Sequence, residues 1–230
     1  MTLKTLMDDA ASIMGNRWNV KDARLVPAAD RLALNGNEAS EIEGTVLYAD
    51  MNESTKMVRS YKNWFAAEMY KIYLHTVSEV LRANNGVITA FDGDRVMAVF
   101  MGDAKNTSAV KAGMQIVFAV NKLNDLIART YRDVTYRIRH SVGIDTGKLF
   151  AVRAGVHGAN DLVWVGEPAN LAAKLTTLDD VDYPIWITKL VYDAMNDSVR
   201  HSESKNMWTE VDELQFGRSV YKTNWWWSIS

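Results

Sequence analysis

The sequence predicts an α+β domain in which helices flank a mixed, mainly antiparallel sheet. Three observations predict this fold class. Apolar runs of strand length alternate with long segments whose apolar residues recur at helical spacing, and one tight turn joins two neighbouring runs as a hairpin. With 230 residues, 48% of them hydrophobic and only three prolines, the chain can also bury a sizeable core.

The N-terminus begins with a short helical pattern of apolar residues between Leu3 and Ala10. Residues 1–42 are otherwise polar and mixed, with a Gly/Asn-rich break at residues 35–37. We therefore expect an N-terminal appendage over residues 1–42, followed by one main domain over residues 43–230.

The centre of the chain alternates strands and helices. The expected order is strand 44–50, helix 55–84, strand 87–91, strand 95–101 and helix 104–130. Asn84-Asn85-Gly86 ends the first long helix, and Asp92-Gly-Asp94 forms a hairpin turn between two strands.

The second half of the chain continues the sheet. We expect strands at 136–145 and 148–152, a glycine-rich excursion at 153–160, a strand at 162–165, a helix opened by Gly166-Glu-Pro168, a strand at 184–187, a short helix, and strands at 209–214 and 218–221. This alternation, with a hairpin inserted, predicts a ferredoxin-like core. The aromatic run Trp225–Trp227 is expected to pack on a dimer partner or on the N-terminal appendage.

Composition excludes several classes of function. Lys and Arg total 26 against 28 Asp and Glu, so the net charge of −2 gives no electrostatic reason to expect nucleic acid as a partner. The absence of cysteine excludes disulfides and thiolate chemistry. No apolar stretch reaches the roughly 20 residues needed to span a bilayer, so we expect a soluble, cytoplasmic protein without membrane contact.

Two carboxylates at strand ends carry the first chemical signal. Asp50 ends a buried strand, and Asp94 lies at the hairpin tip. The polar loop after the first strand consists of Asn52, Glu53, Ser54 and Thr55. Carboxylates beside a loop with free backbone N–H groups can hold divalent ions against a triphosphate.

A helix later in the chain carries the second signal. Asn170 and Lys174 are spaced i, i+4, so they lie on one face of that helix and can reach one anionic target together. An amide donor and a cation suit the charge of a phosphoryl-transfer transition state.

Four motifs in order connect these signals. They are Tyr48–Thr55, Gly93–Phe100, Val142–Lys148 and Val165–Leu175. Together they resemble the catalytic domain of class III nucleotidyl cyclases, over about residues 43–190. The resemblance implies that Asp50, Asp94 and the backbone carbonyl of Met51 bind two Mn²⁺ or Mg²⁺ ions. It also implies that Asn170 and Lys174 stabilise the transition state from the opposite subunit of a homodimer.

The departures from that family concern the base. Adenylate cyclases read adenine with a Lys and an Asp at the positions of Ala90 and Val163, so this chain lacks both polar readers. Lys174 replaces the family's Arg, and Tyr48 replaces a Phe on the same strand face as Asp50. These features resemble the pyrimidine cyclases of the Pycsar anti-phage system.

That resemblance implies a UTP-to-cyclic-UMP cyclase whose product is read by a separate effector protein. Nothing in the residues separates uracil from cytosine, so a cytidylate cyclase is an alternative. An adenylate or guanylate cyclase with other base readers is a second alternative, and a nucleotide-binding sensor without turnover is a third. Arg218 and Lys222 are the candidates for the family's triphosphate-binding lysine.

Overall fold

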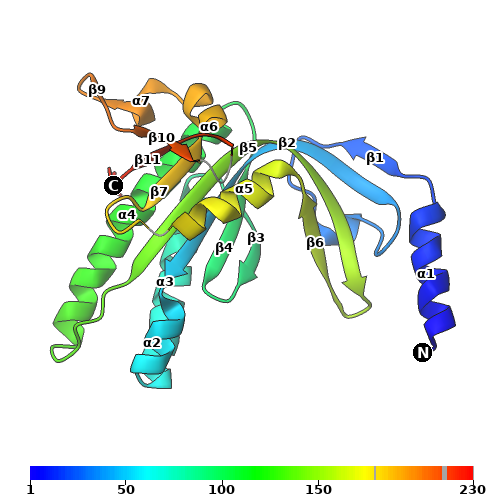
Figure 1. Ribbon diagram of the computed structural model, residues 1–230, viewed down its shortest axis with the longest axis horizontal. Helices are drawn as coiled ribbons and strands as arrows, with labels where there is room; N and C mark the ends of the chain where they lie inside the picture. The colour runs from blue at the N-terminus through cyan, green and yellow to red at the C-terminus, as the bar shows by residue number, and fades with distance from the viewer. Residues whose placement is uncertain (179, 214–216, 230) are drawn as a thin grey trace.

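The computed structural model describes residues 1–178, 180–213 and 217–229 (Figure 1). One twisted sheet runs through the molecule in the order β10-β11-β7-β5-β2-β4-β3, with β1 added to β2 and β6 added to β5. The mixed, mainly antiparallel sheet confirms the predicted fold class. The expected strand 209–214 is β10 (Thr209–Glu213), and its last expected residue, Leu214, lies outside the described residues.

The centre of the sheet is built from two long strands. β2 (Glu38–Asn52) pairs antiparallel with β5 (Arg139–Val156) from Ser40↔Ala151 to Asn52↔Arg139. The sequence predicted shorter elements here: β2 begins before residue 44, and β5 runs through the expected breaks at 146–147 and 153–156. Strand pairing explains the difference, because β2 pairs with β5 at residues 146–147 and β6 pairs with β5 at residues 153–156, so the backbone is satisfied where the sequence alone shows turn residues.

A hairpin extends the sheet on the other side of β2. β4 (Arg95–Phe100) pairs with β2 up to Asp50↔Arg95, and β3 (Val87–Asp92) forms the edge. A second hairpin, β5 with β6 (Ala159–Val165), projects from the body. The expected glycine-rich excursion 153–160 is therefore mostly strand, with its turn at residues 157–158.

Helices cover both faces of the sheet (Figure 1). α2 (Ser54–Ser60), α3 (Asn63–Ala83) and α4 (Lys105–Thr130) pack on one face. The single helix expected at 55–84 is therefore two helices, α2 and α3, separated by residues 61–62. α5 (Glu167–Leu175) lies on the opposite face. Alternation along β2 places Leu47 and Ala49 in the core under α3 and α4, and Val46 in the core under α5.

A close approach fixes α5 on the sheet. A Cβ built on Gly143 of β5 would lie only 2.1 Å from the carbonyl oxygen of Ala172, so only glycine fits beneath this helix. α5 begins after Gly166, which has a φ of 157°. A Cβ at this position would lie 2.8 Å from the Lys148 carbonyl oxygen, so there is no room for a side chain.

The C-terminal part completes the sheet. β7 (Ile185–Thr188) runs parallel to β5, and β11 (Arg218–Thr223) joins β7 to β10. Between them lie α6 (Lys189–Ala194), α7 (Asp197–Arg200), β8 (His201–Ser202) and β9 (Lys205–Asn206). The tryptophan tail packs on α4 of its own chain, where the Trp226 ring lies 5.4 Å from that of Phe118, and not on the N-terminal appendage.

The N-terminal arm, residues 1–22, stands away from the body (Figure 1). It consists of α1 (Leu3–Gly15) and β1 (Asn19–Asp22), and a short 3-10 turn, η1 (Ala29–Arg31), follows it. β1 pairs parallel with the start of β2 at Asn19↔Glu38. No residue of α1 is buried.

Candidate active site

The two predicted carboxylates lie at the same end of the sheet. Asp50 is near the end of β2, and its register partner on β4 is Arg95, the residue directly after Asp94. Arg95 Nη2 donates to Asp50 Oδ2 at 2.7 Å, and the two side chains are only 28% and 18% exposed. The half-buried ion pair ties the hairpin tip to the end of β2.

The charges of both carboxylates affect the pKa of one buried phenol, that of Tyr73. The Tyr73 side chain on α3 is fully buried, and its hydroxyl has no hydrogen-bond partner among the described residues. Burial raises its pKa well above the ordinary value, and the charges of Asp50 and Asp94 raise it further.

Tyr48 lies on the same face of β2 as Asp50, as the strand alternation predicts. Its ring is half-buried, and the Arg95 guanidinium carbon lies 5.9 Å from the ring centroid. Burial raises the pKa of Tyr48, and the Arg95 charge opposes that rise in part. The hydroxyl is therefore neutral at physiological pH and can both donate and accept a hydrogen bond.

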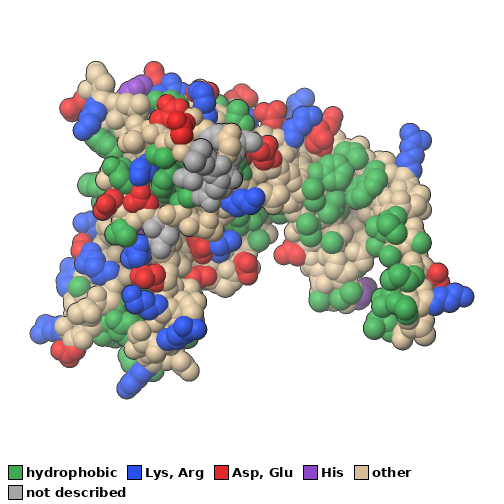
Figure 2. All heavy atoms as spheres, in the orientation of Figure 1, with side chains coloured by type: hydrophobic (Ala, Val, Ile, Leu, Met, Phe, Trp, Pro, Cys, Tyr) green, Lys and Arg blue, Asp and Glu red, His purple; other side chains and the backbone are tan. Residues whose placement is uncertain are grey.

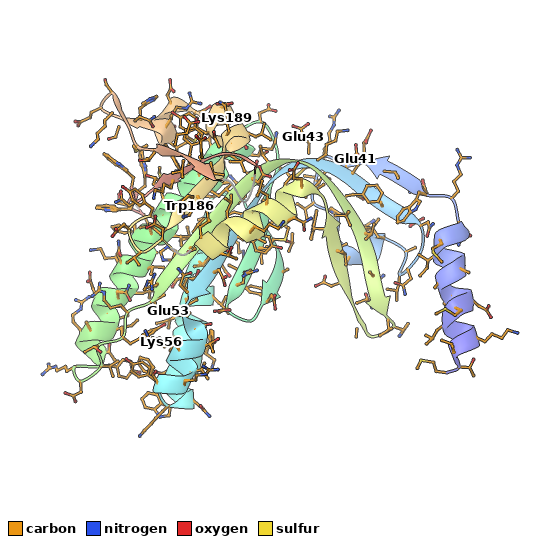
Figure 3. The ribbon with its side chains drawn as sticks, viewed as in Figure 1. Glu41, Glu43, Glu53, Lys56, Trp186 and Lys189 are labelled. Carbon is orange, nitrogen blue, oxygen red and sulfur yellow. The ribbon has the colours of Figure 1, made fainter. Side chains whose placement is uncertain are left out.

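The loop after Asp50 is held by the start of β5. Asn52 Nδ2 donates to Ser141 Oγ at 2.9 Å, and Arg139 Nη1 pairs with Glu53 Oε2 at 3.0 Å. Glu53 has a left-handed backbone, with φ 57°, and its pKa is lowered by the hydrogen bonds from Arg139 and Lys56. Figure 3 shows Glu53 and Lys56 at the junction of β2 and α2.

The rest of that loop opens α2. Ser54 and Thr55 form the first turn, with Thr55 exposed. The side chain of Met51 points the other way into the core and is 3% exposed. Only its backbone carbonyl oxygen could therefore bind a ligand at this end of the strand.

Asn170 and Lys174 lie elsewhere, on α5. Both side chains are exposed, and neither forms a hydrogen bond or ion pair with any described residue. One copy of the chain therefore shows no contact between this pair and the carboxylates in the described ranges.

Lys222 on β11 is firmly positioned. Its Nζ donates to Asp180 Oδ2 at 2.8 Å and lies over the rings of Tyr183, at 4.2 Å, and Trp186, at 5.2 Å. Trp186 is labelled in Figure 3, beside α5. The hydrogen bond from Lys222 lowers the pKa of Asp180. The side chain of the other candidate, Arg218, lies outside the described part.

Known proteins resemble this chain over nearly its whole length. No family profile matches it. A uridylate cyclase from Xanthomonas perforans is 44% identical over 94% of this chain and 94% of its own, and one from Burkholderia cepacia is 40% identical over 97% and 99%. A third, from Rhodovulum, is 35% identical over 96% and 95%. The chain belongs to the uridylate cyclase family.

Solved structures agree on the fold of this family member. The adenylyl cyclase CyaB from P. aeruginosa matches 81% of this chain and 95% of its own with a TM-score of 0.66 at 21% identity. The guanylyl cyclase Cya2 covers 81% and 94% with a TM-score of 0.68 at 17% identity. The fold is that of class III nucleotidyl cyclases.

Ala90 and Val163, the two positions without purine readers, lie on different strands of the sheet. Ala90 on β3 packs in the same apolar cluster as Tyr48, so it borders the Tyr48 face of the sheet. Val163 on β6 is 45% exposed and is not part of that cluster, although its neighbour Trp164 packs against it. The structure thus brings Ala90, but not Val163, to Tyr48 within one chain.

Sequence reasoning missed two residues of this site. Arg95 follows Asp94 directly, but its pairing with Asp50 depends on the register between β4 and β2, which the local pattern of the hairpin does not give. Tyr73 has no local signal, because its position in a helical pattern is that of any core residue.

Proposed function

We propose that this chain converts UTP to 3′,5′-cyclic UMP and pyrophosphate. The near-full-length similarity to three uridylate cyclases carries this proposal. In the reaction the ribose 3′-oxygen forms a bond to the α-phosphorus and loses its proton to solvent. The bond between the α-phosphorus and the bridging oxygen breaks, and pyrophosphate leaves.

Asp50, Asp94 and the Met51 carbonyl oxygen would hold two divalent ions, Mn²⁺ or Mg²⁺. Hard oxygen donors suit these ions, and among the described residues no third acidic or histidine side chain completes a protein-only cage. The remaining ligands would be water and triphosphate. When bound, such ions supply positive charge that favours ionisation of the 3′-hydroxyl and stabilises the triphosphate.

Each remaining site residue has a proposed task. The Tyr48 hydroxyl reads a polar edge of the pyrimidine, beside Ala90 and Val163, which offer no purine-reading group. Backbone N–H groups of Asn52, Glu53, Ser54 and Thr55 face the triphosphate. Asn170 and Lys174 stabilise the charge that develops on the α-phosphate, and Lys222, held by Asp180, binds the outer phosphates.

Two subunits are needed to bring Asn170 and Lys174 to the same site as Asp50 and Asp94. Asn170 and Lys174 make no described contact with the carboxylates of their own chain, and this supports a homodimer in which each site combines both copies. In this proposal residues 43–230 form the catalytic domain and residues 1–42 its N-terminal appendage. The cyclic nucleotide serves as an anti-phage second messenger for a separate effector.

Product identification tests the proposal. The protein is incubated separately with each of the four ribonucleoside triphosphates and Mn²⁺, and the products are identified by mass. Cyclic UMP should dominate. Dominant cyclic CMP or cyclic AMP would refute the base assignment, and tight UTP binding without product under either metal would indicate a sensor.

A matched pair of variants tests the metal ligands. Asp50→Asn should lower kcat by more than about 100-fold, since even outer-shell partners of a metal site cost 10 to 100-fold. Asp92→Asn removes an exposed carboxylate from the same hairpin tip and should leave kcat nearly unchanged. Equal activity of the two variants would remove Asp50 from the site.

A further inference from the structure

The N-terminal arm carries an apolar stripe that its own chain leaves uncovered. The stripe consists of Leu3, Leu6, Met7, Ala10, Ile13 and Met14, which recur every three or four residues along α1. Leu3 is 72% exposed and Met14 79%. Figure 2 shows apolar side chains gathered along this helix. A stripe of this kind is typical of a helix packed against a partner.

The fold fixes the direction in which the stripe points. Asn37, a buried side chain, donates to the Ile13 carbonyl oxygen at 2.8 Å and to that of Asn16 at 2.6 Å, at the end of α1. The Trp18 ring packs against that of Phe150, 5.5 Å away. These contacts anchor the C-terminal end of α1 to the main domain and fix its direction relative to β2.

A matching apolar groove lies at the edge of the sheet. It has a volume of about 610 Å³ and is lined by Ser78, Arg82, Gly86, Val87, Ile88 and Phe91. Val87 and Phe91 on β3 are 46% and 59% exposed. β3 ends the sheet on this side, and an exposed apolar edge strand is a surface that proteins normally cover.

One charge on each of the two surfaces is complementary to the other. Asp9 borders the stripe on α1 and pairs with no described residue. Arg82 lines the groove, and its Nη1 lies 3.5 Å from Oε1 of Glu79, a solvent-exposed neighbour on the same helix. Such a pair is weak and can be exchanged for one across an interface.

We propose that α1 of one copy docks in the β3 groove of a second copy. This inference rests on the proposed two-subunit active site, which already requires a second copy. Figures 1 and 2 show the arm and the body that carries β3 on opposite sides of a hollow. Because a two-fold pair uses each contact twice, both copies would exchange arms and the assembly would close at a dimer.

Cysteine cross-linking tests this contact directly, because the chain contains no cysteine. Leu6→Cys and Val87→Cys variants are mixed, allowed to exchange subunits and treated with a short bifunctional thiol reagent. A cross-linked dimer should form in the mixture. Ser12→Cys, on the opposite face of α1, should give none with Val87→Cys.

Three outcomes would overturn the inference. Cross-linking of Leu6→Cys alone would indicate that α1 pairs with α1. Cross-linking within one chain of the Leu6→Cys/Val87→Cys double variant would indicate the chain's own groove as the site. Absence of any product in the mixture would exclude the contact.

A second measurement does not depend on cysteines. Leu6→Glu/Ile13→Glu should raise the dimer dissociation constant by about tenfold or more in sedimentation, with an unchanged circular dichroism spectrum because α1 has no buried residue. An unchanged dissociation constant would contradict the docking. Asp50→Asn serves to separate the two proposals, since it should abolish product formation while the cross-link persists.

Discussion

Arg95 holds the carboxylate that the proposed metal ions need. Its guanidinium donates to Asp50 at 2.7 Å, so a cation must compete with it for the same oxygen. Arg95→Gln should therefore tighten Mn²⁺ binding in the absence of nucleotide. The expected gain in affinity is about tenfold, because the variant loses the charge-assisted hydrogen bond that competes with the ion for Asp50. Mn²⁺ titration followed by electron paramagnetic resonance measures this, and weaker binding would show that Arg95 supports the metal site.

The hydroxyl of Tyr48 is the single group that the proposal assigns to base choice. Tyr48→Phe keeps the ring and its packing but removes one hydrogen-bonding group. The ratio of kcat/KM for UTP to that for ATP should fall about tenfold, the value of one hydrogen bond of roughly 1.4 kcal/mol. Tyr192→Phe, remote on α6, is the control, and an unchanged ratio in both variants would exclude Tyr48.

His140 makes stability depend on pH. Burial lowers its pKa from 6.5 to about 4. Between these values the unfolded chain binds a proton that the folded chain does not, so the free energy of unfolding falls as pH drops from 6.5 toward 4, by up to about 3 kcal/mol. Urea unfolding at several pH values measures the slope. His140→Leu should flatten it and the exposed-site control His157→Gln should not.

The contact between α5 and β5 governs the element that carries Asn170. Gly143→Ala would place a Cβ 2.1 Å from the Ala172 carbonyl oxygen, so the helix must shift. We expect a loss of about 1–3 kcal/mol in unfolding free energy together with lower kcat. Gly113→Ala on α4, whose Cβ would meet only side chains at 3.4 Å or more, should be neutral or stabilising. Equal melting temperatures would contradict the close packing.

Element by element, the sequence predicted what depends on local pattern. Strand 44–50 and its terminal Asp50 followed from an apolar run that stops at a carboxylate, and the hairpin followed from Asp92-Gly-Asp94. The break of the long helix at residues 61–62 and the full length of β5 were not predicted, because they depend on pairing and packing with residues far away in the sequence. The Arg95–Asp50 pair was missed for the same reason.

At the scale of the whole molecule, subunit mixing tests whether each site combines two copies. Asp50→Asn and Asn170→Ala should each be nearly inactive alone. When mixed and exchanged, they should recover about one quarter of wild-type activity, since half of the dimers are mixed and each mixed dimer has one intact site of two. Recovery of no activity would place both residues in a site made by one chain.

Among the described residues no helix is long and apolar enough to cross a membrane. The overall shape, an arch with the arm at one end, could not be predicted from the sequence. The helical pattern of α1 was visible there, but its separation from the body depends on the parallel pairing of β1 with β2.

β2 joins that arm to Asp50 without interruption. From Glu38 to Asp50 a strand spans about 40 Å at its usual rise, and every second residue faces the same way. Deleting one residue anywhere in this stretch would reverse the facing of one end relative to the other. The length of β2 therefore determines on which side of the sheet Asp50 lies relative to the arm. Only insertions or deletions of an even number of residues preserve that relation.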